Sequence, residues 1–74
     1  MSDTKILVIG ANGQLGSVLV KELQKKYGLE NIVASDIRNN ENFNGLFEKL
    51  DATSFEAMQE LIVKYAITQI YHLA

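Results

Sequence analysis

Three glycines and one carboxylate have the residue types and spacing needed to bind an anion beside a sugar. Gly10, Gly13 and Gly16 form a G-x-x-G-x-x-G run, and Asp36 follows at a later strand end. Glycines let the main chain come close to phosphate oxygens, and free amides at a helix start attract negative charge. A carboxylate can accept hydrogen bonds from ribose hydroxyls. These residues together predict a dinucleotide-binding turn.

Each glycine of this run has a separate expected task. Gly10 should turn the chain off the preceding strand, Gly13 should leave room for the phosphates, and Gly16 should let the next helix approach the strand. Main-chain amides of the same loop should also face the anion, and they belong to Asn12, Gln14 and Leu15. A glycine-rich turn can also be no more than a tight connection, so the neighbouring elements decide between the two interpretations.

The charge next to the ribose favours NAD over NADP. Asp36 would repel a 2′-phosphate, which NADP carries and NAD lacks. Arg38 lies two positions further on and could in principle receive that phosphate. The charge nearest the ribose should dominate, so NAD is the expected cofactor. The structural alternative is that Asp36 is only a polar strand end.

The elements that would position these residues alternate between strand and helix. Lys5–Ile9 is a β-branched apolar run that predicts a strand buried on both faces. A helix should follow, capped at its C-terminus by Gly28. Asn31–Asp36 predicts a second buried strand, and residues 38–45 predict a polar loop. The expected apolar stripe of the helix is Leu15, Val18, Leu19, Leu23 and Tyr27.

The second half repeats the alternation. Leu46–Leu50 is a weakly patterned third strand, and Gln69–Ala74 is a fourth. Thr53, with Glu56 three residues later, fits a capping box that would start a second helix. The expected stripe of this helix is Phe55, Met58, Leu61, Ile62 and Tyr65. The order predicts an α/β protein, a partial Rossmann fold with a parallel sheet of about four strands in the order 3-2-1-4 and helices on its faces.

Composition narrows the function classes. The chain has 74 residues and no cysteine, which excludes a disulfide framework, a thiolate zinc site and a cysteine nucleophile. His72 alone cannot hold a metal, and packing is its expected role. A net charge of -2 gives no reason to expect nucleic acid or a membrane as partner. No apolar run approaches a membrane span and no signal peptide is visible, so we expect a cytoplasmic protein.

At this point the residues resemble a known family. The glycine spacing, S-D-I-R at residues 35–38, L-D-A at 50–52 and Y-H-L-A at 71–74 resemble extended short-chain dehydrogenases/reductases, the group of NAD-dependent sugar epimerases, dehydratases and related dehydrogenases. The resemblance covers essentially the whole chain but only the first part of such an enzyme. It is strongest to the branch that oxidises L-threonine to 2-amino-3-ketobutyrate with NAD. UDP-sugar 4-epimerases and dehydratases are the alternative branch.

The resemblance implies a role for each matching position. The pyrophosphate would lie on the three glycines with Gln14 and Leu15. Asp36 and Ile37, followed by Arg38, would hold the adenosine ribose and the adenine edge. Leu50, Asp51 and Ala52 would lie at the adenine, although Asp51 could equally be a solvated acid at a helix start. Leu73 and Ala74 would line the path toward the nicotinamide ribose.

The residues that perform hydride chemistry in this family are missing from the chain. The family uses a Tyr-x-x-x-Lys pair, but Asn31 stands four positions after Tyr27 and Gln69 four after Tyr65. We therefore expect an N-terminal, NAD-binding portion without catalytic residues, whose parent enzyme binds a small-molecule substrate and is often a homodimer. A non-enzymatic dinucleotide-binding module is the other class of function that stays open.

Overall fold

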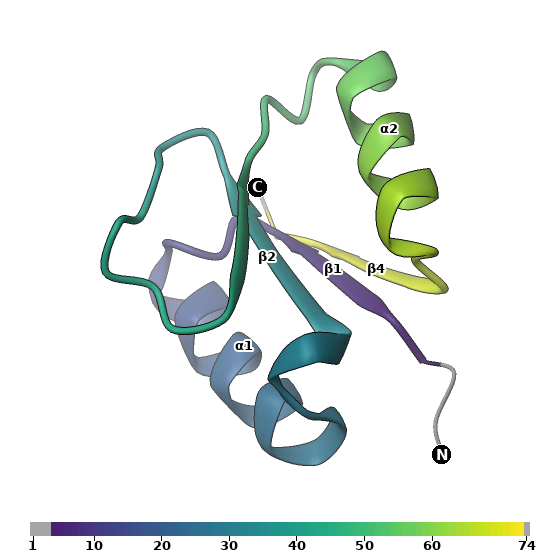
Figure 1. Ribbon diagram of the computed structural model, residues 1–74. Helices are drawn as coiled ribbons and strands as arrows, with labels where there is room; N and C mark the ends of the chain where they lie inside the picture. Colours follow the sequence, from purple (N-terminus) through teal and green to yellow (C-terminus); the bar gives the residue numbers. More distant parts are fainter. Residues whose placement is uncertain (1–3, 74) are drawn as a thin grey trace.

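The computed structural model describes residues 4–73 and shows a parallel sheet between two helices (Figure 1). The strand order is β3-β2-β1-β4, as the sequence predicts. A one-turn 3-10 helix, η1, precedes the second strand. The elements in chain order are β1 (Ile6–Ile9), α1 (Gln14–Tyr27), η1 (Leu29–Asn31), β2 (Ile32–Asp36), β3 (Leu46–Lys49), α2 (Phe55–Tyr65) and β4 (Gln69–His72).

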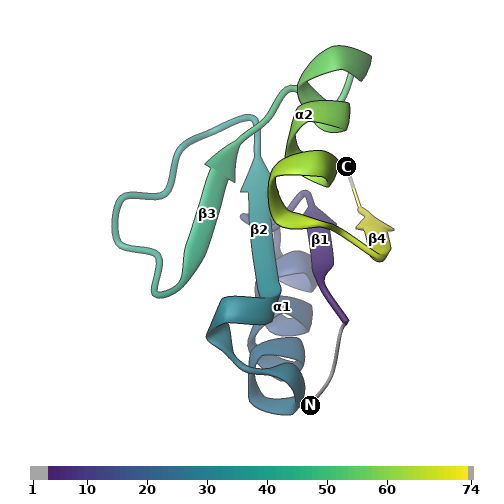
Figure 2. The same ribbon diagram turned by 45° about the vertical axis from the view of Figure 1, so that its right-hand side comes forward.

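The two helices cover opposite faces of the sheet, which the turned view also shows (Figure 2). Side chains alternate along a strand, so β1 contributes to both hydrophobic clusters. Ile6 and Val8 pack in the cluster that contains Val20 of α1. Leu7 and Ile9 pack in the cluster that contains Leu61 of α2. All four β1 side chains are buried, which confirms the predicted central strand.

Every strand pair is parallel, so the carboxyl ends of all four strands meet at one edge of the sheet. Ile9 at the end of β1 lies beside Ser35 in β2 and beside His72 in β4. Asp36 pairs with Lys49 at the end of β3. Loops that follow these strands therefore converge, and in open α/β sheets ligands bind at that edge.

The predicted apolar stripe of α1 is confirmed at Leu19, Leu23 and Tyr27, which pack in or against the core, but not at its first two residues. Leu15 and Val18 are 79% and 62% exposed, whereas Gly16, Val20 and Leu23 are buried. The buried residues follow the i, i+4, i+7 spacing of one helix face. Gly16 packs against the main chain of Gly10 and Ala11, and this contact sets the rotation of α1 so that Val20 is buried in place of Val18. Gly28 has a φ of 93° and caps the helix as predicted.

The start of α2 is also corrected. Ser54, not Thr53, is the N-cap, and its Oγ accepts a hydrogen bond from the Ala57 amide over 3.3 Å. The predicted capping box fails because the Thr53 hydroxyl donates to Asp51 instead, over 2.7 Å. Phe55, expected in the apolar stripe, is 75% exposed, because the first turn of α2 projects beyond the sheet (Figure 1).

A polar cluster joins α2 to β3. The Tyr65 hydroxyl donates a hydrogen bond to Glu48 Oε2, and Lys64 Nζ lies 3.0 Å from the same oxygen. These bonds, led by that of Tyr65, hold the pKa of Glu48 below its ordinary value, although partial burial opposes the effect. The same bond raises the pKa of Tyr65. The cluster therefore ties the C-terminal end of α2 to β3.

Residues 4–73 contain neither a membrane-spanning helix nor a cluster of metal ligands. No helix in this range is long and apolar enough to cross a membrane. No group of three or more potential metal ligands occurs in the same range.

Candidate functional site

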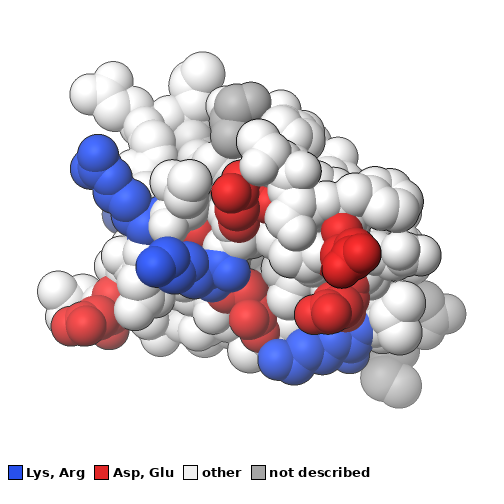
Figure 3. All heavy atoms as spheres, turned by 90° about the horizontal axis from the view of Figure 1, so that it is seen from above, with Lys and Arg blue, Asp and Glu red and all other residues white. Residues whose placement is uncertain are grey.

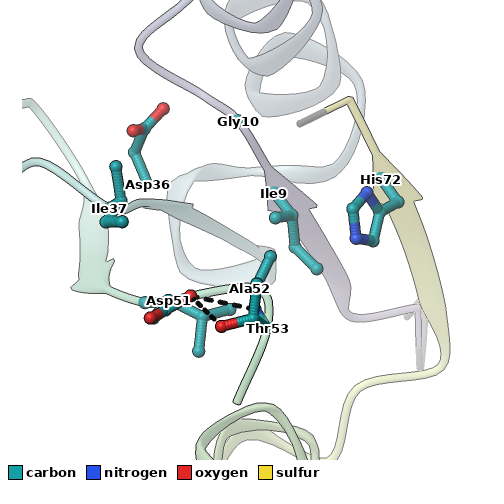
Figure 4. A pocket seen from close by; sticks show the side chains of 9 residues that line it. Ile9, Gly10, Asp36, Ile37, Asp51, Ala52, Thr53 and His72 are labelled. Atoms are coloured by element: carbon teal, nitrogen blue, oxygen red, sulfur yellow. Dashed lines mark hydrogen bonds between the residues drawn. The ribbon is translucent and has the colours of Figure 1, made fainter. Parts of the chain in front are cut away.

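A pocket of about 340 Å³ opens at the carboxyl edge of the sheet (Figure 4). Its lining comes from the ends of all the strands and from the segment that leads into α2. Figure 4 shows Asp36 and Ile37 on one side of the pocket and His72 on the other. The lining residues are Ile9, Gly10, Asp36, Ile37, Leu50, Asp51, Ala52, Thr53 and His72.

The glycine turn forms the border between this pocket and α1. Gly10 has a φ of 91°, a conformation that residues with a Cβ rarely adopt. A Cβ on Gly16 would lie 2.2 Å from the Gly10 carbonyl oxygen, so only glycine fits there. Gly13 is exposed, and a Cβ on it would make only an ordinary contact of 3.6 Å with the same oxygen. The turn is therefore closed toward the sheet and open toward solvent at Gly13.

The N-terminus of α1 carries no side-chain cap. Gly13 is the N-cap, no acidic residue lies in the first turn, and the first hydrogen bond of the helix is accepted by the Gly13 carbonyl from Ser17. Amides in a first helical turn have no partner within the helix, and their dipoles give this end a partial positive charge. The amides of Gln14 and Leu15 are thus placed to bind an anion.

Two main-chain amides hold the Asp36 carboxylate in place. Oδ2 accepts a hydrogen bond from the Asn12 amide over 3.0 Å, and Oδ1 accepts one from the Arg38 amide over 3.3 Å. The first of these donors belongs to the glycine turn. Each carboxylate oxygen has a second lone pair, so both can still accept a bond from a hydroxyl group. Asp36 is therefore a fixed acceptor beside the anion-binding turn.

Asp51 lies at the mouth of the pocket with one oxygen already engaged. Its Oδ1 accepts hydrogen bonds from the hydroxyl and the amide of Thr53, over 2.7 and 2.9 Å. These bonds, with the hydroxyl contributing most, lower the pKa of Asp51. The group is exposed and stays charged at neutral pH. Asp51 therefore both shapes the segment before α2 and presents a carboxylate to the pocket.

The structure brings together six of the predicted site residues: Gly10, Asp36, Ile37, Leu50, Asp51 and Ala52. The rest of the glycine-turn residues, Gly13, Gln14, Leu15 and Gly16, lie at the start of α1, next to the lining. Arg38 is exposed and does not line the pocket, although its amide contacts Asp36. Leu73 is 43% exposed and donates its amide hydrogen to the Ile9 carbonyl. Ala74 lies outside the described residues.

Three lining residues were absent from the predicted set: Ile9, Thr53 and His72. Ile9 and His72 are register partners on neighbouring parallel strands, so the expected strand order already placed both at this edge. Thr53 gave no such signal, because its place depends on the bonds to Asp51.

These features fit the two ends of an adenosine diphosphate group. The uncapped helix start suits a pyrophosphate, and the fixed carboxylate of Asp36 suits a ribose diol. The side chains of Ile9, Ile37 and Leu50 give the pocket apolar walls on which a flat base can pack. On the face seen from above, acidic and basic side chains are interspersed rather than gathered by sign (Figure 3).

Comparisons with known proteins agree with this geometry. Residues 6–74 match the NAD dependent epimerase/dehydratase family. An uncharacterized epimerase/dehydratase of Staphylococcus haemolyticus is 38% identical, over 95% of this chain and 23% of that protein. A counterpart in Staphylococcus aureus is 39% identical with the same coverage. The chain thus spans about a quarter of the length of these relatives.

Solved structures are similar over nearly the whole chain. L-threonine dehydrogenase from Clostridium difficile superposes with a TM-score of 0.91 and 41% identity, covering 96% of this chain and 24% of that one. A GalE-like L-threonine dehydrogenase from Cupriavidus necator, in its holo form, gives a TM-score of 0.90 and 38% identity, covering 95% and 23%.

Proposed function

Because this chain belongs to the NAD-dependent epimerase/dehydratase family, whose fold and cofactor it shares, we propose that it is the N-terminal, NAD-binding portion of an L-threonine 3-dehydrogenase. Such an enzyme oxidises L-threonine to 2-amino-3-ketobutyrate. The observation that carries the substrate assignment is the likeness to L-threonine dehydrogenases, with a TM-score of 0.91 at 41% identity. In this assignment residues 1–74 hold the cofactor, and the catalytic and substrate-binding residues belong to the rest of the enzyme.

The residues of this chain bind and orient the cofactor. The turn at Gly10, Gly13 and Gly16 would receive the pyrophosphate, with the amides of Gln14 and Leu15 as donors. Asp36 would accept hydrogen bonds from the adenosine ribose, and its negative charge would disfavour a 2′-phosphate. When bound, NAD supplies the hydride acceptor of the reaction.

The remaining pocket residues would surround the base. Ile37, Leu50 and Ala52 would pack against the adenine, and the carboxylate of Asp51 would face its amino group. The main-chain amide of Arg38 would keep its hydrogen bond to the Asp36 carboxylate. Leu73 and Ala74 would line the path toward the nicotinamide ribose.

The test uses the full-length protein that carries this sequence. We expect NAD to bind more tightly than NADP in calorimetric titrations, and L-threonine to reduce NAD in a spectrophotometric assay. Absence of NAD binding would reject the cofactor site itself. NAD binding without threonine oxidation would reject only the substrate assignment.

A UDP-sugar 4-epimerase or dehydratase is the second candidate, because the curated relatives carry the name epimerase/dehydratase. Interconversion of UDP-sugars in the absence of threonine oxidation would favour it. A non-enzymatic NAD-binding module would show neither reaction. It would also have no Tyr-x-x-x-Lys pair in the remaining coding sequence.

A further inference from the structure

We propose that the side chain of Asn12 is a positioning residue that couples the glycine turn to the loop after β2, and thereby sets the preference of the site for a ribose without a 2′-phosphate. The proposal rests on the proposed NAD-binding function of the pocket. It concerns a residue whose side chain does not line that pocket.

Asn12 makes three hydrogen bonds that cross from the turn to the end of β2 and beyond. Its amide donates to Asp36 Oδ2 over 3.0 Å. Its Nδ2 donates to the Arg38 carbonyl over 2.8 Å, and its Oδ1 accepts from Asn40 Nδ2 over 3.3 Å. Every polar atom of the side chain is thus used to tie residues 38 and 40 to the glycine turn.

These bonds bear on both oxygens of the Asp36 carboxylate. The Asn12 amide holds one oxygen directly. The other oxygen accepts from the amide of Arg38, the residue whose carbonyl the Asn12 side chain holds. Removing that side chain would leave the first bond in place and free the Arg38 carbonyl, which lies one peptide unit beyond the amide that donates to Oδ1. The side chain therefore restrains the residue whose amide supplies one of the two contacts to Asp36.

The same contact restrains Arg38, which is the cation nearest to Asp36 along the chain. Arg38 is exposed and its side chain does not line the pocket. To neutralise a 2′-phosphate, its guanidinium group would have to reach the ribose end of the pocket. With its carbonyl tied to Asn12, the Arg38 main chain cannot shift freely for that purpose. Loss of the tie should weaken NAD binding and relax the exclusion of NADP.

The experiment compares Asn12→Ala with the wild type in the full-length protein by calorimetric titration with NAD, NADP and nicotinamide mononucleotide. We expect the Kd for NAD to rise about three- to tenfold, the cost of one or two exposed hydrogen bonds. The Kd for NADP should stay constant or fall, so the NADP-to-NAD ratio of Kd values decreases. Binding of the mononucleotide, which lacks adenosine, should not change.

Asn42→Ala is the matched control. It removes the same type of side chain from the loop that follows β2, and within residues 4–73 the Asn42 side chain makes no hydrogen bond. We expect Asn42→Ala to keep the wild-type ratio of the Kd for NADP to the Kd for NAD. Thermal unfolding of each variant reports any general loss of stability.

An unchanged ratio in Asn12→Ala would overturn the proposal. Equal weakening of NAD and NADP binding, together with a lower Tm, would also overturn it, because a merely structural role predicts that pattern. If the wild type binds neither dinucleotide, the proposed function itself fails. The wild-type titration thus separates the two failures.

Discussion

Gly16 in α1 lies directly against the carbonyl oxygen of Gly10, so close that a Cβ on Gly16 would be 2.2 Å from that oxygen. The contact joins the first helical turn to the end of β1. It holds the uncapped helix start beside the pocket, which is why the anion site and the ribose acceptor are neighbours.

This contact predicts different outcomes for two glycine substitutions. Gly16→Ala must push α1 away from a main-chain atom, and such overpacking costs about 1–3 kcal/mol of unfolding free energy. Gly13→Ala adds a Cβ at an ordinary 3.6 Å, where φ is already -74°. The second variant should keep its stability within about 1 kcal/mol but bind NAD more weakly, because the methyl group occupies the open side of the turn.

Urea denaturation and NAD titration of both glycine variants test this pair. A Gly16→Ala protein as stable as the wild type would contradict the close approach. A Gly13→Ala protein with wild-type NAD affinity would contradict the anion site.

Substitution of Asp36 tests the ribose acceptor. Asp36→Asn keeps the shape of the side chain but removes its charge. Hydrogen bonds to charged groups are worth about 1.5–3 kcal/mol, so NAD affinity should fall about 10- to 100-fold. NADP binding should fall less, because the repulsion of the 2′-phosphate disappears.

Titration with both dinucleotides measures the Asp36 effect. The control is Glu41→Gln, which removes the charge of an exposed side chain in the loop after β2. This variant should leave the affinities for NAD and NADP unchanged. If Asp36→Asn weakened the binding of NAD and NADP equally, Asp36 would have no role in discriminating between the two cofactors.

Tyr65→Phe should make the protein less stable in a pH-dependent way. Its hydroxyl is the main reason that the pKa of Glu48 lies below the ordinary 4.5. A carboxyl group with a lowered folded-state pKa stabilises the fold above its unfolded pKa, and this stability is lost as pH falls through the folded value. The variant should therefore lose about 1 kcal/mol near neutral pH and much less at pH values well below 4.5, where Glu48 is protonated in the folded protein as well.

Denaturation curves across this pH range check the Tyr65 prediction. Tyr71→Phe removes a hydroxyl from the exposed strand β4 and serves as the control. A destabilisation by Tyr65→Phe that is the same at both pH extremes would show that the bond to Glu48 is not its source.

A polypeptide of these 74 residues alone should show no dehydrogenase activity. None of its three tyrosines is followed four positions later by lysine, so the pair that performs hydride chemistry in the family is absent from the chain. The measurement is NADH formation from L-threonine and NAD, with the full-length protein as the positive control. Robust turnover by the short chain would refute the expectation.

The sequence by itself determined the parallel α/β fold, the strand order and the positions of the glycine turn and Asp36. The strands and the glycine turn depend on local signals, and the strand order follows from the connection rules of parallel α/β folds. A buried β-branched run such as Ile6–Ile9, and glycines at a strand-to-helix turn, restrict the backbone whatever their neighbours are. The family resemblance followed from the same residues.

Tertiary structure decided which side chains share the site and which helix face is buried. Val20 replaces Val18 in the core because the close contact at Gly16 sets the rotation of α1. The Thr53 hydroxyl donates its hydrogen bond to Asp51, which places Thr53 at the pocket. Ser54 therefore serves as the N-cap of α2 in its place. Such choices arise from competition between nearly equivalent local partners, and only contacts between elements resolve them.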